Sequence, residues 1–386
     1  MIITLLSILL VINNQIDKNY FYPSFLYNLI WFFILSLHHL VRALNLIEID
    51  SLNIYTELYV LFSVISFSTG SIVIKILNKK ISKIKEQKSI YKLKYDNILF
   101  YISIFGLLLF INKAFQIVSV SSNEHFLIAL RTELNYNNQG YGWISYFVTI
   151  GIFNATSRIL SFNTKSDKIK LVISYVIATL FCILTTGRTF FLLLLILTIG
   201  LLAIRNKISL KKIFYSLIIM LFIFIIMGSA LQKNQLNSIL MYSLGPISAF
   251  NNTFNNVSSN YFGEHTLRFF YIITNNIGIT NVKTVDLIRP YSEIPFKINV
   301  YTAFSNYISD FGIIISLIII FFIGSIHTIL FEFSKYKNAT YKYLSALSNY
   351  PLIMVFFQDQ YFSLLSTWIQ FIILSFIILY PYKINK

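Results

Sequence analysis

Arginine is the residue type whose placement most clearly indicates chemistry in this sequence. The chain has 31 lysines and arginines, and on the membrane topology argued below nine of them face the outside. Five of these nine are arginines, namely Arg42, Arg131, Arg188, Arg268 and Arg289. A guanidinium is a planar fork of donors that binds phosphate or carboxylate in a bidentate manner, whereas an ammonium group is a point charge. The outer face is therefore expected to hold an anion.

Arg188 is the strongest of these candidates. It lies in the segment Thr185 to Thr189, between two long apolar runs, so a tight turn must hold it at or just below the outer membrane surface. A charge at that depth costs free energy unless it faces a cavity or a partner. The alternative is an arginine that reaches up to the lipid head groups. Gly187 would let a ligand approach the backbone closely, and we expect Arg188 to bind substrate.

A second group of candidates lies in one long polar segment further along the chain. Arg289 either forms a salt bridge with Asp286 or Glu293, or binds an anion. Arg268 follows His265 at a spacing that puts both side chains on one face of a helix. His265 and Arg268 are each either functional or ordinary solvated surface residues.

Few groups on the outer side can exchange a proton near neutral pH. Asp310 opens an apolar run, where its carboxylate would gain from the helix dipole, pair with an arginine or hold a sugar hydroxyl. Glu293 and His265 are the other proton acceptors. Asp359 is expected to be only a turn residue.

No Asp-x-Asp pattern and no glycine-rich phosphate loop occurs, so we expect neither a metal nor a cofactor.

Composition places the chain in a membrane. It is 56% hydrophobic and only 12% charged, with a mean hydropathy of +0.69, whereas soluble domains carry about 25% charged residues. Nearly all of the +16 net charge falls in loops on one side, so it reflects membrane topology and not nucleic-acid binding. The single cysteine, Cys182, excludes an internal disulfide framework.

Hydropathy predicts an all-α, polytopic bundle of about eleven spans, at roughly 20 apolar residues for each crossing. We expect the spans near residues 1–16, 25–44, 54–77, 98–118, 143–162, 169–187, 189–204, 213–231, 306–330, 342–358 and 360–380.

Lysine-rich loops orient this bundle. Residues 78–97 carry seven lysines and are expected in the cytoplasm, which leaves the N-terminus outside and the C-terminus inside. Two long loops, 119–142 and 232–305, then lie outside. The first opens with Ser121 and Glu124 at capping-box spacing, so a short helix is expected along the membrane surface there, carrying Arg131 as an anchor. We expect one integral membrane domain over residues 1–386.

Together these motifs resemble a known family. A Gly187-Arg188 turn between two spans is followed by a large outer loop, by the segment Asn299-Val-Tyr301-Thr-Ala-Phe and by Asp310-Phe-Gly312. This pattern, over most of residues 54–330, resembles the O-antigen polymerase family (Wzy-type), which assembles bacterial surface polysaccharide.

The resemblance implies a multi-pass protein of the bacterial inner membrane with a GT-C-like architecture and its active site facing the periplasm. It implies metal-independent transfer of a glycan from undecaprenyl diphosphate onto another lipid-linked repeat unit, beside a chain-length co-polymerase (Wzz-type). Arg188 and Arg289 match the diphosphate-binding arginines best, with Arg268 or Arg131 in support.

For the acceptor the resemblance leaves several residues open. His265, Glu293 or Asp310 would orient or deprotonate the acceptor hydroxyl, and Tyr301 belongs to the expected substrate-binding surface. Related ligases use a loop histidine, to which His265 could correspond.

Two alternatives stay open. One is the O-antigen ligase, which has a different acceptor, and the other is a flippase or transporter of the lipid-linked oligosaccharide. A transporter is expected to have ionisable residues near the bilayer midplane and internal symmetry. The sequence has few charges within the predicted spans and no internal repeat.

Overall fold

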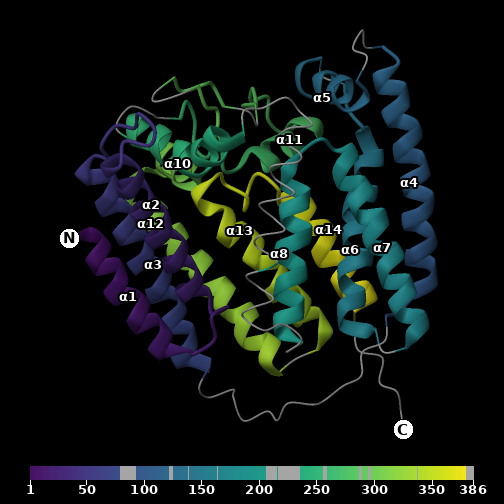
Figure 1. Cartoon of the computed structure of the whole chain (residues 1–386), viewed down its shortest axis with the longest axis horizontal. Coiled ribbons are helices and arrows are strands. Elements are labelled where there is room, and N and C mark those ends of the chain that lie inside the picture. The colour runs from purple at the N-terminus through teal and green to yellow at the C-terminus, as the bar shows by residue number, and fades with distance from the viewer. Residues whose placement is uncertain are drawn as a thin grey trace. The chain divides into compact units, whose positions relative to one another are not determined.

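The computed structural model describes residues 1–78, 93–120, 125–137, 139–162, 164–205, 215, 235–254, 259–286, 289–293, 297–336 and 338–379. Within these ranges the chain is helical (Figure 1), and its β structure is one isolated antiparallel bridge between Ser292 and Ile298. Four of the described helices are long and apolar enough to cross a membrane: α2 (Pro23–Ala43), α3 (Ile54–Asn78), α4 (Asp96–Val118) and α12 (Ala303–Tyr336). The protein is therefore a helical membrane protein.

The remaining helices are shorter or less apolar. They are α1 (Ile2–Ile16), α5 (Phe126–Tyr136), α6 (Tyr146–Ser161), α7 (Lys165–Leu184), α8 (Arg188–Ile204), α10 (Gln235–Thr253), α11 (Arg268–Asn276), α13 (Ala339–Ile353) and α14 (Leu365–Ile378), with 3₁₀ turns at Gly142–Ser145 and Met354–Phe356. Each expected span contains a described helix except 213–231, which lies outside the described residues apart from residue 215. Most of the basic loop 78–97 and the residues Ser121 and Glu124 also lie outside them. The total of eleven spans stays a prediction.

Residue contacts divide the chain into two compact units. Unit 1 comprises Met1–Lys85, Leu236–Phe333 and Ser348–Ser366, and unit 2 comprises Glu86–Gln235, Ser334–Leu347 and Thr367–Lys386. The single domain expected over residues 1–386 stays a prediction, and each unit is described by itself.

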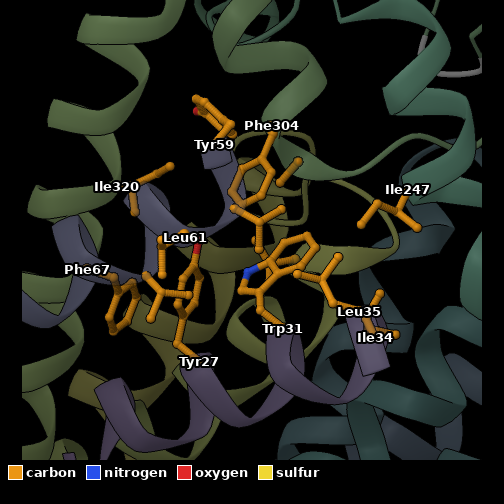
Figure 2. Close-up of a cluster of buried hydrophobic side chains, with 14 of the residues drawn as sticks. Tyr27, Trp31, Ile34, Leu35, Tyr59, Leu61, Phe67, Ile247, Phe304 and Ile320 are labelled. Carbon is orange, nitrogen blue, oxygen red and sulfur yellow. The ribbon is translucent and has the colours of Figure 1, made fainter. Parts of the chain in front are cut away.

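An aromatic cluster at the centre of unit 1 holds the start of α12 (Figure 2). The indole of Trp31, from α2, stacks on Phe304 with ring centroids 4.6 Å apart, and Tyr59 of α3 meets Phe304 edge-on at 5.0 Å. All three side chains are buried. Because a close-packed interior resists displacement of its large side chains, this cluster fixes the backbone that carries the neighbouring polar residues of α12.

Small residues bring α3 and α12 into backbone contact. A Cβ atom added at Gly70 would lie 2.2 Å from the carbonyl oxygen of Phe321, and one at Gly324 would lie 2.4 Å from that of Phe67. The Ser66 hydroxyl donates to a carbonyl of α12 at 2.7 Å. Small residues at helix contacts allow such close approach in membranes.

A kink at Gly312 divides α12. This glycine has φ 75° and ψ 175°, a left-handed φ that other residues adopt only with strain. The kink divides the helix into a short first segment, which begins at Ala303 and carries Asp310, and the long apolar segment that follows. The expectation that Asp310 opens the span was therefore wrong, since seven helical residues precede it.

In unit 2 the arginines Arg158 and Arg205 have structural partners. The Arg158 side chain, only 4% exposed, pairs with Asp96 at 2.8 Å and donates to the Asn154 carboxamide at 3.0 Å. Arg205 donates to the Phe162 carbonyl at 2.9 Å and lies over that ring. These two guanidiniums bind the helices to one another.

Candidate functional site

Unit 1 contains a small polar pocket that opens to the surface, with an enclosed volume of about 30 Å³. It is lined by His265, Arg268, Val285, Asp286, Arg289, Asn299, Tyr301, Asn306, Gln358 and Ser363. Its walls come from the segment around α11, from the start of α12 and from the turn between α13 and α14. In Figure 1 the helices α10 and α11 run across the top of the view.

Arg289 is held rigidly in this pocket. Its Nη1 donates to the Ser305 hydroxyl at 2.5 Å, and its guanidinium lies 5.4 Å from the centroid of the Tyr301 ring. The Tyr301 hydroxyl in turn donates to the Pro290 carbonyl at 3.1 Å, which secures the chain beside the arginine. The alternative of a salt bridge is not observed, because no ion pair joins Arg289 to Asp286 or Glu293.

The second terminal nitrogen of Arg289, Nη2, is buried and has no hydrogen-bond partner among the residues that the structure describes. Burial lowers the pKa of this guanidinium, opposed by the Tyr301, Asp310, Asp359 and Glu264 side chains. A buried charge with an unused donor is costly. A bound anion would supply the missing acceptor and a negative charge in direct contact with the guanidinium.

Arg268 provides a second cation in the same pocket. It is the first residue of α11, and its Nε donates to the Val285 carbonyl at 2.6 Å. His265 lies in the turn before α11, so the expectation that His265 and Arg268 share a helix face was wrong. Both nevertheless line one pocket, because the turn folds back over the start of α12.

The His265 ring is oriented by Asp310. Its Nδ1 lies 3.0 Å from an oxygen of the Asp310 carboxylate, whose side chain is fully buried while that of His265 is 19% exposed. The carboxylate also accepts from the backbone N–H of Thr266 at 2.7 Å and from the Ser259 hydroxyl at 2.5 Å. Asp310 therefore caps the turn that carries His265, and not the helix α12 as its position in the sequence indicated.

The hydrogen bond to Asp310 determines which nitrogen of the His265 ring is a donor and which is an acceptor. A buried carboxylate is an acceptor for Nδ1–H, which leaves Nε2 as a base in a side chain that lines the pocket. A carboxylate that orients an imidazole in this way is a recurrent feature of proton-transfer sites.

The other predicted residues lie elsewhere. Glu293 is exposed and does not line the pocket. Arg131 lies half-buried on α5, and Arg188 is the first residue of α8, both in unit 2. The terminal nitrogens of Arg188 are buried.

The tight turn expected before Arg188 is confirmed. Its left-handed residue is Thr186, with φ 52°, whereas Gly187 has the extended φ of −98°. A side chain at Gly187 would meet only ordinary contacts, with its Cβ 3.7 Å from the Thr185 carbonyl oxygen. The structure therefore assigns the conformational strain of this turn to Thr186.

Sequence reasoning missed the neutral wall of the pocket. Asn299 and Asn306 occur within or beside the segment that carries the family resemblance, which is a signal in retrospect. Gln358 and Ser363 lie some fifty residues further along the chain, and no local pattern marks them. Among the described residues no group of three or more His, Cys, Asp or Glu side chains is placed to hold a metal ion.

Comparison of this chain with protein-family models, with curated proteins and with solved structures finds no match.

Proposed function

We propose that this protein is an O-antigen polymerase: a metal-independent glycosyltransferase that moves a glycan from undecaprenyl diphosphate onto a lipid-linked repeat unit. The proposal places it in the bacterial inner membrane, with the pocket of unit 1 facing the periplasm. A Wzz-type co-polymerase is the expected partner for control of chain length.

The observation that carries the proposal is the pocket itself. Arg268 and Arg289 line it together, the Nη2 of Arg289 is buried without an acceptor, and His265 beside them is oriented by Asp310. A diphosphate leaving group needs fixed positive charge, and an acceptor hydroxyl needs a base. This pocket offers both within one unit of a membrane protein.

In the proposed reaction, His265 Nε2 accepts the proton of an acceptor sugar hydroxyl as its oxygen bonds to the anomeric carbon of the donor. The bond between that carbon and the phosphate oxygen breaks, and undecaprenyl diphosphate leaves with the electron pair. Arg268 and Arg289 stabilise the charge that develops on the leaving oxygens. Asp310 stabilises the imidazolium that forms.

Arg188 keeps its expected role as a second diphosphate ligand in the proposal, and Arg131 a supporting one. Both belong to unit 2, and their part in binding has its own test. Glu293 has no role in the proposed step.

Transfer by the purified protein in nanodiscs tests the proposal, with the lipid-linked glycan extracted from the producing cells as substrate. Arg289→Lys keeps the positive charge but loses the planar guanidinium that binds phosphate in a bidentate manner. We expect the rate of glycan transfer to fall roughly 10²-fold or more. Lys297→Ala, which removes an exposed cation of the same segment, is the matched control and should leave the rate within about twofold. Equal rates for wild type and Arg289→Lys would refute the proposal.

The oriented histidine also favours a second candidate, the O-antigen ligase, since the ligases that resemble this chain use a loop histidine. A deletion strain separates the two. Without a polymerase, cells make caps of a single repeat unit, whereas without a ligase the polymer accumulates on its lipid carrier.

A further inference from the structure

The lining of the pocket in unit 1 contains two chemically different sets of side chains. The cationic wall comprises the guanidiniums of Arg268 and Arg289, and the neutral wall comprises the carboxamides of Asn306 and Gln358 with the hydroxyl of Ser363. Carboxamides and hydroxyls each offer both a donor and an acceptor, which matches the hydroxyl groups of a sugar. A pocket that combines both sets suits a ligand with an anionic part and a polyhydroxylated part.

A buried carboxylate holds this neutral wall in place. Asp359 is only 1% exposed. It accepts from the Tyr307 hydroxyl at 2.9 Å and from the backbone N–H of Tyr361 at 2.9 Å. The turn that it closes carries Gln358 on one side and Ser363 on the other, and Tyr307 adjoins Asn306 on α12. Asp359 is thus a turn residue, as expected, and its buried carboxylate also accepts a hydrogen bond from α12.

The negative charge of Asp359 also acts on Arg289 in the cationic wall. Its carboxylate is among the groups that favour the charged form of Arg289. Burial raises the pKa of Asp359, opposed by the hydrogen bonds from Tyr307 and from the turn. Because these hydrogen bonds need only an acceptor oxygen, an asparagine side chain is able to replace it.

Resting on the proposed function, we infer that Gln358 and Asn306 bind hydroxyls of the sugar attached to the diphosphate, and that Asp359 is the positioning residue for this sugar subsite. The pocket then recognises a glycosyl diphosphate as a unit, with phosphates on the arginine wall and the first sugar on the amide wall.

Binding measured by native mass spectrometry tests the inference, with two probes: undecaprenyl diphosphate, and the undecaprenyl-diphosphate-linked glycan extracted from cells that carry this protein. Wild type should bind the glycosylated lipid about 3–10-fold more tightly, the gain expected from one or two neutral hydrogen bonds. Gln358→Ala or Asn306→Ala should reduce that preference to below about twofold without changing affinity for the plain lipid. Gln116→Ala, an exposed amide on α4, is the control and should keep it.

Two further variants isolate the role of Asp359. Asp359→Asn keeps the acceptor oxygen and should retain the sugar preference, whereas Asp359→Ala should lose it. Loss of the sugar preference in both Asp359 variants would refute the hydrogen-bonding role. Retention of the preference in both would show that Asp359 does not position the sugar subsite. A melting temperature equal to that of wild type would show that Asp359→Ala is folded. If Asp359→Ala does not fold, Tyr307→Phe is the second variant, because it removes one donor to the same carboxylate.

The two proposals fail differently. If Arg289→Lys leaves affinity for plain undecaprenyl diphosphate unchanged, the proposed function fails. If Arg289→Lys weakens both lipids while Gln358→Ala and Asn306→Ala keep the sugar preference, the sugar subsite alone is refuted.

Discussion

At the scale of single residues, the arginines of this protein divide by what surrounds them. Arg158 and Arg205 have carboxylate, carboxamide or carbonyl partners in unit 2. Arg289 has one hydroxyl partner and one buried nitrogen without an acceptor. A buried donor left unsatisfied costs about 1–3 kcal/mol, and more for a charged group. The proposed anion site depends on this difference in partners more than on the count of arginines.

The His265–Asp310 pair leads to a prediction about proton transfer. His265→Ala should lower the transfer rate by about 10²–10⁴-fold, as expected for removal of a general base. Asp310→Asn keeps the shape and should still cost on the order of 10²-fold, because the imidazolium loses its countercharge. Ser309→Ala, next to Asp310 on α12, is the control. Single-turnover transfer at saturating lipid is the measurement, and an unchanged rate in His265→Ala would remove the base from the mechanism.

Arg188 has its own prediction. If it binds the donor diphosphate, both Arg188→Ala and Arg188→Lys should shorten the polysaccharide chains that cells produce, because lysine lacks the bidentate fork. Gel separation of the extracted polysaccharide measures chain length. Chains of normal length in both variants would show that the buried guanidinium of Arg188 has only a structural role.

At the scale of helices, the contact between α3 and α12 positions the site, because α12 carries Ser305, Asn306 and Asp310. Two glycines allow that contact. Gly70→Ala and Gly324→Ala place a Cβ within 2.2 Å and 2.4 Å of a carbonyl oxygen on the opposite helix. We expect each to destabilise the protein by roughly 1–3 kcal/mol through overpacking.

Thermal unfolding in detergent checks this, with Gly187→Ala as the matched control. Gly187 has extended backbone and room for a Cβ, so its replacement should change stability by less than about 0.5 kcal/mol. A melting temperature for Gly324→Ala equal to that of Gly187→Ala would show that the two helices are free to separate.

The helices themselves were largely predictable, and the site was predictable in part. Apolar runs located α2, α3, α4, α7, α8 and the long part of α12 within a few residues. Short helices were expected in the loop 232–305, but the position and length of α10 were not, and Pro246 lies inside this helix. Its Asn251 carboxamide accepts from the Asn53 N–H at 2.6 Å.

The residues of the site differ in how far local sequence reveals them. Arg289 and His265 stood out by type and surroundings. The hydrogen bond between His265 and Asp310 spans 45 positions, and Gln358 lines the same pocket as Arg289 although it lies further still along the chain. Long-range pairing of this kind is decided by how α12 packs, which no local pattern encodes.

At the scale of the whole molecule, the charge asymmetry leads to a prediction of orientation. Lysine-rich loops are expected inside and the pocket segment outside. With the buried Cys182 replaced by alanine, Glu293→Cys should react with a membrane-impermeant maleimide in intact spheroplasts. Lys165→Cys should react only after the membrane is permeabilised. The reverse pattern would place the pocket in the cytoplasm, where a periplasmic polymerase has no substrate.

The most direct measurement of the central claim is a cryo-electron microscopy structure of the protein in nanodiscs with undecaprenyl diphosphate. We predict diphosphate density in contact with Arg268 and Arg289, with the Nη2 of Arg289 donating to a phosphate oxygen and His265 beside it. A pocket of unit 1 that stays empty of lipid, while the diphosphate binds elsewhere on the protein, would contradict the account.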